Sequence, residues 1–267
     1  MTIRAHFGLE RNPFDEEHPA LLPHQKEVFD TLLVHSQQGG LCLVMGEPGT
    51  GKSVLKQALA RHDPKRMLVP VVSRTLHTYP NTLQILCEAF GIEVRAQTAR
   101  REKMLIEAAW KANRNRKMLV PIIDDAHLMD IECLRRLRLL LEDFPKCHNL
   151  VLVAQNPLLD KLRLGANEDI RSRVTYSVSM PRLAPEDVRA FIFAQFDRVA
   201  LAHSAFSDEA IDLVVRSSDG ILRRARNLCV SAMYEAFHDR VNTVGLGQVN
   251  SVLMQPHWRK DNDIPAG

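Results

Sequence analysis

The amino-acid sequence predicts an α/β fold in which a parallel five-stranded sheet, flanked by helices, is followed by a small all-α domain. Short apolar runs alternate with segments of helical period along the first two thirds of the chain, as expected for strands buried between two layers of helices. After residue 182 only helical periods remain. A glycine-rich loop joins the first strand to the next helix, which is the order of a βα unit. The expected strands cover residues 41–45, 67–72, 117–124, 149–154 and 174–180.

The composition is that of a folded protein. The 267 residues are 45% hydrophobic, which is enough to bury a core. No apolar run approaches the ~20 residues of a membrane span, and the start lacks the apolar stretch of a secretory signal, so we expect a cytoplasmic protein without membrane insertion. The five cysteines form no CxxC pair, which argues against a disulfide framework or a zinc site. The net charge of +3 does not by itself indicate a nucleic-acid binder.

Changes in pattern divide the chain into four expected parts. Residues 1–24 contain several prolines and no sustained period, and the helical segments after Pro181 end before a polar tail. Within the helical part, Ser207 is an expected N-cap and Gly220 an expected break. The expected parts are an N-terminal segment (1–24), an α/β domain (25–182), a helical lid (183–254) and a polar tail (255–267).

One segment carries a phosphate-binding pattern. Residues 46–53 read Gly-Glu-Pro-Gly-Thr-Gly-Lys-Ser, which fits G-x-x-x-x-G-K-[ST] between a buried strand and a helix. In such a P-loop, backbone N–H groups and the helix dipole hold phosphates, Lys52 neutralises the β- and γ-phosphates, and Ser53 ligates Mg²⁺. A glycine-rich turn that matches by chance is the alternative. The expected nucleotide-binding residues are Gly46, Glu47, Pro48, Gly49, Thr50, Gly51, Lys52 and Ser53, together with Asp124.

Two aspartates end the third expected strand. A hydrolytic P-loop protein needs an acidic residue at the end of a buried strand to hold the Mg²⁺ shell, and Asp124 stands at that place. Asp125 follows, where a carboxylate can orient and polarise the attacking water. A helix N-terminus whose aspartates only favour the macrodipole is the alternative. The two motifs together predict an ATPase that uses ATP, Mg²⁺ and water.

Beyond these motifs, the chain resembles one branch of the AAA+ ATPases. The order FGLERNPF, GEPGTGKS, IIDDAHL, LVLVAQNPLL, IRSRV and GILRRARNLC is similar to the ExeA-type branch, from about Phe7 to Val252. That branch includes secretion-associated ATPases and the ATP-dependent helpers of DDE transposases, the TniB, TnsC and Mu B class. The P-loop and acidic strand are generic, whereas their combination with the NPF opening and the GILRR segment is more specific.

The resemblance implies roles for further residues. Gln155 matches the first sensor, which touches the γ-phosphate and the attacking water, although it could simply cap a strand end. Arg173 matches the arginine finger that reaches the nucleotide of a neighbouring subunit, with Arg171 as the competing choice and a surface ion pair as the alternative for either. Arg223 matches the second sensor, which links nucleotide state to lid angle.

The sequence departs from the family pattern at two of these places. Leu222 stands where Gly-x-Pro-Arg has proline, which weakens the assignment of Arg223. Asp125 stands where glutamate is common, and the shorter side chain implies slow hydrolysis. The opening segment resembles the part of the family that packs over the adenine, with Phe7, Pro13 and Phe14 as candidate contacts. Core packing would explain these three residues equally well.

Positive charge is concentrated between residues 95 and 117. Eight basic residues stand against Glu102 and Glu107, and Arg135, Arg136 and Arg138 form a second group. In a side-by-side assembly such segments could line a channel that binds a DNA backbone without reading bases. A solvated helix face is the alternative for each run. The basic residues of the first run are Arg95, Arg100, Arg101, Lys103, Lys111, Arg114, Arg116 and Lys117.

Three hypotheses follow for the use of ATP. The first is a DNA-transposition helper, an ATP-dependent homo-oligomer (ring or filament) that binds double-stranded DNA without sequence preference and recruits or regulates a DDE transposase. The second is an ExeA-type secretion or cell-envelope assembly ATPase, whose relatives usually carry a membrane helix and a wall-binding domain after the ATPase. The third is a nucleotide-switched scaffold that hardly hydrolyses ATP. The lack of such extra domains after the lid favours the first hypothesis.

Overall fold

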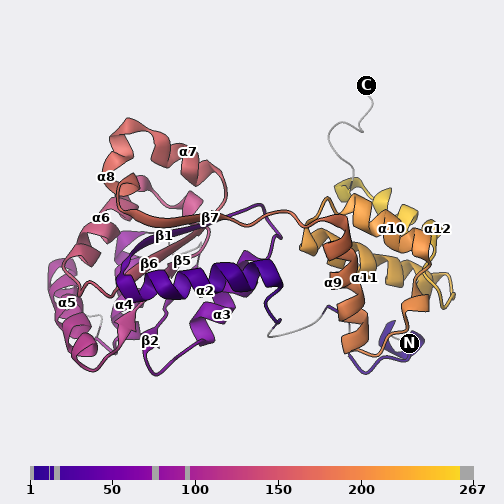
Figure 1. The fold of residues 1–267 in the computed structure, drawn as a ribbon, viewed down its shortest axis with the longest axis horizontal. Coiled ribbons are helices and arrows are strands. Elements are labelled where there is room, and N and C mark those ends of the chain that lie inside the picture. The colour runs from indigo at the N-terminus through magenta and orange to yellow at the C-terminus, as the bar shows by residue number, and fades with distance from the viewer. Residues whose placement is uncertain (1–2, 12, 15–18, 74–77, 94–96, 259–267) are drawn as a thin grey trace. The chain divides into compact units, whose positions relative to one another are not determined.

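The computed structural model describes residues 3–11, 13–14, 19–73, 78–93 and 97–258, and Figure 1 draws the chain. The chain forms two compact units. An α/β unit comprises His18–Glu47 and Gly51–Met180. A helical unit comprises Met1–Glu17, Pro48–Thr50 and Pro181–Gly267.

The α/β unit is built on a parallel sheet of five strands, as the sequence predicts. The strand order is β3-β5-β6-β1-β7, and all neighbours run parallel. Met45, the last residue of β1, pairs with Ala154 on one side and Ser179 on the other, so three strands end level with one another. The strands are β1 (Gly40–Met45), β3 (Val71–Val72), β5 (Ile122–Ile123), β6 (Asn149–Ala154) and β7 (Val174–Ser179).

Proline interrupts two of the expected strands. The segments 67–72 and 117–124 each divide, giving β2 (Met67–Leu68) and β4 (Met118–Leu119), which pair separately from β3 and β5. Pro70 and Pro121 lie at the two interruptions, and proline has no N–H to donate. The carbonyl of Pro70 still accepts a hydrogen bond from Ile122 N at 2.9 Å, so the two segments stay side by side. Each segment therefore continues past its proline toward the carboxyl edge of the sheet.

Helices cover both faces of the sheet because side chains alternate along each strand. On β1, Cys42 and Val44 belong to a core with α2 and α3, whereas Leu41 and Leu43 belong to a core with α4, α5 and α6. Figure 1 shows α2 and α3 together, in front of the sheet. The helices of this unit are α2 (Pro23–Gln38), α3 (Lys52–Arg61), α4 (Tyr79–Ala89), α5 (Thr98–Arg114), α6 (Ile131–Glu142), α7 (Pro157–Arg163) and α8 (Glu168–Arg171).

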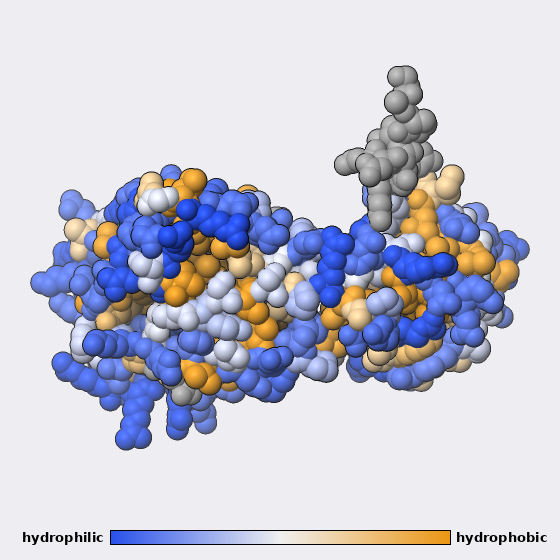
Figure 2. All heavy atoms as spheres, turned by 45° about the horizontal axis from the view of Figure 1, so that its top comes forward, coloured by the Kyte–Doolittle hydropathy of each residue, from blue (hydrophilic) through white to orange (hydrophobic). Residues whose placement is uncertain are grey.

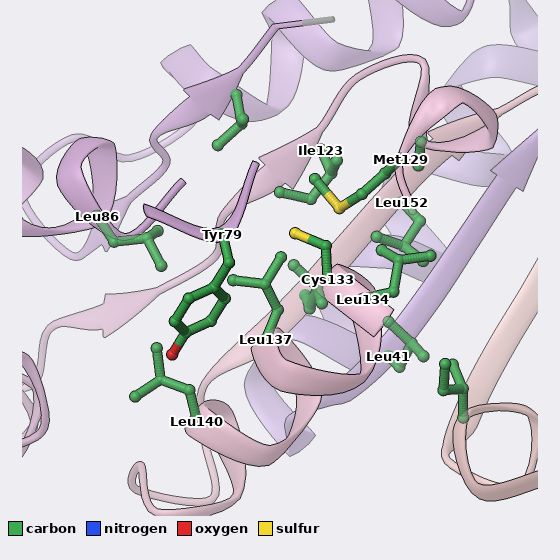
Figure 3. Close-up of a cluster of buried hydrophobic side chains, with 14 of the residues drawn as sticks. Leu41, Tyr79, Leu86, Ile123, Met129, Cys133, Leu134, Leu137, Leu140 and Leu152 are labelled. Carbon is green, nitrogen blue, oxygen red and sulfur yellow. The ribbon is translucent and has the colours of Figure 1, made fainter. Parts of the chain in front are cut away.

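Helix α6 supplies much of the second core. It begins at Asp130, whose side chain accepts a hydrogen bond from Glu132 N, and its apolar residues recur at helical spacing. Each buried leucine of this kind contributes about 1.5–3 kcal/mol by leaving water. Figure 3 shows the cluster, in which α6 contributes Cys133, Leu134, Leu137 and Leu140, the strands Leu41, Ile123 and Leu152, and neighbouring segments Tyr79, Leu86 and Met129.

The helical unit has its own core around Phe196, which is fully buried. Ser207 caps α10 by accepting from Ala210 N at 3.2 Å, and Gly220 has φ +73° in the turn before α11, so both expectations for this part are confirmed. Phe14 is buried here against the rings of Phe191 and Phe196. Its helices are α1 (Ile3–His6), α9 (Pro185–Arg198), α10 (Asp208–Ser217), α11 (Leu222–His238) and α12 (Leu246–Leu253).

Figure 2 shows hydrophilic residues over most of the visible face, with apolar residues in separate areas. Among the helices within the described ranges, none has both the length and the apolar character needed to cross a bilayer.

Candidate nucleotide-binding site

The P-loop follows β1 and leads directly into α3. Gly49 and Gly51 have φ angles of +91° and +97°, a region that residues with a side chain rarely adopt. Gly51 is the N-cap of α3, and its carbonyl accepts from Val54 N at 3.0 Å. The first turn of α3 contains no acidic residue, so the positive end of the helix dipole is not offset there. This backbone is suited to hold an anion at the helix N-terminus.

The Lys52 side chain folds back across the loop that precedes it. Its Nζ donates to the carbonyl oxygens of Gly46 at 2.7 Å and Glu47 at 2.8 Å. Both acceptors are neutral carbonyls, and the ammonium charge is therefore held over the loop, beside the N-terminus of α3. This is the place where a bound phosphate would need it.

The sheet brings the other motif residues to the same edge. Asp124 follows β5, and Gln155 follows β6, which is flanked by β5 and β1. Because these strands are parallel, their carboxyl ends meet at one edge, where the P-loop also begins. The structure thus gathers Lys52, Asp124, Asp125 and Gln155 from separate parts of the sequence.

Asp124 has a partner that the sequence reasoning missed. Lys56 Nζ forms an ion pair with Asp124 Oδ2, and both side chains are about four-fifths buried, with 19% and 22% exposed. The other carboxylate oxygen, Oδ1, accepts from Asp125 N at 3.2 Å. Lys56 lies one turn after Lys52, on the same face of α3, and this i, i+4 spacing is the signal that could have identified it.

Asp125 has an unusual backbone conformation. Its φ of +49° and ψ of +39° lie in the left-handed region, which aspartate tolerates better than most residues but still at some cost in energy. It begins the short 3₁₀ helix η2 (Ala126–Leu128). Such strain concentrates at functional sites, where the surroundings hold the residue in place.

His127 connects the turn after Asp125 to the position predicted as the first sensor. Gln155 N donates to His127 Nδ1 at 3.4 Å, and Lys161 Nζ donates to the carbonyl of His127 at 2.7 Å. The backbone at Gln155 is therefore tied to the segment that holds Asp125. Sequence reasoning passed over His127, because a histidine three residues after the acidic strand gives no spacing signal of its own.

The oxygen donors of this site fit Mg²⁺. Ser53 is exposed in the first turn of α3, and Asp124 is a carboxylate at the end of β5. Hydroxyl and carboxylate oxygens are the ligands that this hard cation accepts, usually with several waters. The ammonium of Lys56 already neutralises part of the Asp124 charge, so the carboxylate is better suited to hold the hydration shell than to bind the metal tightly.

Arg173 and Arg171 lie far from the P-loop of their own α/β unit. Both precede β7, whose first residues are at the amino edge of the sheet. Arg173 is 62% exposed and pairs with Glu142 at 3.2 Å, whereas Arg171 pairs with Glu168 within α8. From Val174 to Ser179 a strand rises about 17 Å, at roughly 3.3 Å per residue. This separation is longer than an arginine side chain.

Arg223 belongs to the helical unit. It is an exposed residue in the first turn of α11, and the Leu222 before it is buried. Phe14, which the resemblance places over the adenine, packs inside the helical core, and Phe7 lies at the margin of that core. Their location is the one that simple core packing would give.

The two basic groups differ in their surroundings. Arg95 lies outside the described residues, and Arg101 is half-buried. Of the second group, Arg135 pairs with Glu132 and Asp169, Arg138 pairs with Glu142, and Arg136 lies over the Tyr79 ring. The side chains of the second group therefore form ion pairs and a cation–π contact within the α/β unit. Exposed side chains of the first group are those of Arg100, Lys103, Lys111, Arg114, Arg116 and Lys117.

Comparison with known proteins agrees with this geometry. Residues 34–162 match a family model described as AAA domain. The chain is similar to the ORC2 protein of Aeropyrum pernix (TM-score 0.70, 18% identity, covering 92% of this chain and 72% of that one). It is also similar to Cdc6p of Pyrobaculum aerophilum (TM-score 0.69, 15% identity, 90% and 68%). The fold is that of an AAA+ P-loop protein.

A curated relative is similar in sequence as well. General secretion pathway protein A of Aeromonas hydrophila is 26% identical over an alignment of 247 residues that covers 86% of this chain. The chain spans 44% of the length of that relative. The similarity to General secretion pathway protein A is therefore one of sequence over part of that protein, whereas the similarity to the ORC2 and Cdc6p structures is one of fold.

Proposed function

We propose that this protein binds Mg·ATP, hydrolyses it to ADP and phosphate, and uses the nucleotide to control its own assembly. The observation that carries the proposal is the meeting of the P-loop, the two aspartates and Gln155 at one edge of the sheet. Adenine nucleotides are favoured because the similar Aeropyrum pernix ORC2 protein was solved in ADPNP–ADP complexes.

Each residue of the edge has a part in the reaction. Lys52 exchanges its two carbonyl contacts for phosphate oxygens, and the α3 N-terminus adds its dipole. Ser53, and Asp124 through waters, would hold Mg²⁺, which would supply charge neutralisation at the phosphates. Asp125 orients a water whose oxygen bonds to the γ-phosphorus as the bond to the bridging oxygen breaks. Gln155 contacts that water and the γ-phosphate.

Arg173 acts on a neighbouring subunit in this proposal. Because it lies at the opposite edge of the sheet, its guanidinium serves a second copy of the chain and completes that copy's site. ATP then favours the assembled state, and hydrolysis releases it. Asp125 is shorter than glutamate, so we expect slow release.

The test combines nucleotide turnover with light scattering on the full chain. Lys52→Ala should abolish ATP binding, whereas Asp125→Asn should bind ATP, fail to hydrolyse it and stay assembled. Arg173→Ala should lose hydrolysis by 10²-fold or more and lose ATP-dependent assembly. Arg163→Ala, an equally exposed arginine of the same unit, is the matched control. If Arg173→Ala matches Arg163→Ala in turnover, the trans role is wrong.

For the purpose of the assembly we propose binding to double-stranded DNA, as in a DNA-transposition helper that recruits a DDE transposase. The exposed cations on and after α5 are the specific observation that favours it, since they could displace counterions from phosphates. The affinity for DNA should fall with rising salt, and each lost phosphate contact should reduce the slope of log affinity against log salt concentration (the salt slope) by about one. Arg100 and Lys103 are exposed residues of this face, one turn apart.

The DNA proposal has a charge-matched test. Arg100→Glu with Lys103→Glu should weaken ATP-dependent binding to duplex DNA at least tenfold and reduce the salt slope by about two. Arg61→Glu with Lys65→Glu changes the net charge equally at exposed sites off α5 and should have little effect. No binding of the parental protein at low salt with ATP would eliminate the DNA proposal.

A secretion-linked assembly ATPase is the second candidate. The similarity to General secretion pathway protein A favours it. ATP-dependent assembly without DNA binding is the result that this candidate expects, so the same titrations separate the two.

A further inference from the structure

A cavity of about 440 Å³ lies in the α/β unit at the amino edge of the sheet. It is bordered by the first residues of β1, β6 and β7 and by the last turn of α6. The P-loop follows the other end of β1, so this cavity is separate from the candidate nucleotide site. Its volume is within the range of ~300–1,000 Å³ that small-molecule sites occupy. Its apolar wall is formed by Leu41, Leu141, Phe144 and Leu150.

Two of the residues that line the cavity, Arg138 and His148, carry a buried polar atom that has no hydrogen-bond partner among the described residues. The two atoms are Arg138 Nε and His148 Nε2. Both side chains are otherwise well held. Arg138 Nη1 donates to Glu142 at 2.6 Å, and the His148 ring, whose residue is 6% exposed, meets the Phe144 ring edge-on at 5.5 Å. A buried polar atom without a hydrogen-bond partner lowers the stability of the fold by about 1–3 kcal/mol. A ligand that forms hydrogen bonds with both atoms would therefore recover this loss.

The two atoms have opposite hydrogen-bonding character. Arg138 Nε–H is a donor. His148 Nδ1 lies 3.1 Å from the carbonyl oxygen of Pro145, which can only accept, so Nδ1 carries the ring proton and Nε2 is an acceptor. Burial lowers the pKa of His148 to about 4, and the ring is therefore neutral at pH 7. A matching ligand must present an acceptor and a donor together.

Charge at the cavity favours an anion. Arg138, Lys146 and Arg173 line it together with one carboxylate, Glu142, which gives an excess of two positive charges among these four side chains. Glu142 already serves both Arg138 and Arg173. Asp169 contacts Arg138 at 3.7 Å but does not line the cavity, and it reduces this excess without removing it.

We propose that this cavity binds a small organic acid that carries a hydroxyl group next to its acid group. The acid accepts from Arg138 Nε and lies near the cations of Arg173 and Lys146. The hydroxyl donates to His148 Nε2, and the carbon skeleton rests on the apolar wall. Because Glu142 and the bound acid would compete for Arg173, occupancy also affects the arginine predicted as the finger, a consequence that rests on the proposed function.

The test uses probes that differ by one hydroxyl. L-malate and succinate are titrated into the full chain without nucleotide, by calorimetry and by ligand-observed NMR, with citrate and 3-phosphoglycerate as larger hydroxy acids. We expect saturable binding of at least one hydroxy acid, and malate at least fivefold tighter than succinate. His148→Phe keeps an aromatic ring but removes Nε2. The affinity for malate should therefore fall to that for succinate, while the affinity for succinate stays unchanged. Arg138→Lys keeps the charge but removes Nε–H, and it should lower the binding affinity for all these acids tenfold or more.

His62→Phe, an exposed histidine of the same unit, is the control and should bind like the parental protein. The variants are first compared by circular dichroism, so that Arg138→Lys remains informative if His148→Phe fails to fold. No saturable binding of any probe up to about 10 mM would mean that water alone fills the cavity and would overturn the proposal. Equal binding of malate and succinate, or affinities unchanged in both variants, would overturn it as well. These titrations contain no ATP, so their failure is independent of the nucleotide proposal.

Discussion

Lys56 provides the most specific prediction about the candidate site. Its ammonium pairs with Asp124, the carboxylate proposed to hold the Mg²⁺ shell, and the pair is mostly buried. Lys56→Met keeps the length and the packing of the stem and removes the charge. A dication and this ammonium repel each other, so the variant should bind Mg²⁺ with nucleotide more tightly than the parental protein.

The size of the effect follows from Coulomb's law. Charges of +1 and +2 about 6 Å apart repel by roughly 1.4 kcal/mol at the dielectric of water and by roughly 5.5 kcal/mol at an effective dielectric near 20. The lower value is appropriate, since 19% of the Lys56 side chain is exposed and the ammonium can turn toward solvent when the metal binds. We therefore expect about a tenfold decrease in the Mg²⁺ concentration needed for half-maximal nucleotide binding.

The assay is a Mg²⁺ titration of fluorescent ATP analogue binding at fixed ionic strength. Lys26→Met is the matched control, because Lys26 forms an exposed i, i+4 pair with Asp30 in the same unit and should leave the midpoint unchanged. A higher Mg²⁺ requirement in Lys56→Met would refute the reasoning, since it would mean that Lys56 holds Asp124 in position for the metal rather than competing with it.

Three further outcomes follow. Asp125→Asn should retain ATP affinity within about twofold and lose turnover by 10²-fold or more, as single-turnover kinetics would measure, and parental turnover would exclude Asp125 as the water-orienting group. His148 is neutral in the fold because burial lowers its pKa from 6.5 to about 4, so stability is fully present above pH 6.5 and decreases as the pH falls toward 4, by up to about 3 kcal/mol. Urea midpoints across this range should show that loss, and an identical pH profile in His148→Gln would contradict it. Phe196→Ala should cost the helical unit about 3–5 kcal/mol of unfolding free energy, clearly more than Phe193→Ala, and equal urea midpoints for the two would refute the assignment of Phe196 to the core.

Much of the fold and of the candidate site could be predicted from local pattern. A buried strand, a glycine-rich loop and a helix follow one another at 41–61, and a parallel sheet necessarily brings the ends of its strands to one edge. Asp124 and Gln155 could therefore be placed near the P-loop without any knowledge of side-chain contacts. Their chemical roles remain predictions that the variants above test.

Long-range side-chain contacts were beyond the sequence. Arg135 and Arg138 looked like surface charge, yet both contact Asp169, and these contacts depend on how α6 meets α8. The Arg138–Glu142 pair, by contrast, is an i, i+4 pair within α6. The Lys56–Asp124 pair depends likewise on which face of α3 turns toward β5, although the i, i+4 spacing from Lys52 was a signal for that face. Pro70 and Pro121 could be read from the sequence. Their effect on strand pairing could not, because it depends on segments 67–72 and 117–124 being neighbours in the fold.

Equilibrium dialysis of the folded protein against labelled ATP, with and without Mg²⁺, tests the central claim most directly. We expect saturable uptake of about one ATP per chain with Mg²⁺. This uptake should be lost in Lys52→Ala, since Lys52 lies over the loop that would receive the phosphates. Absence of uptake by the parental protein, or equal uptake by Lys52→Ala, would contradict the account.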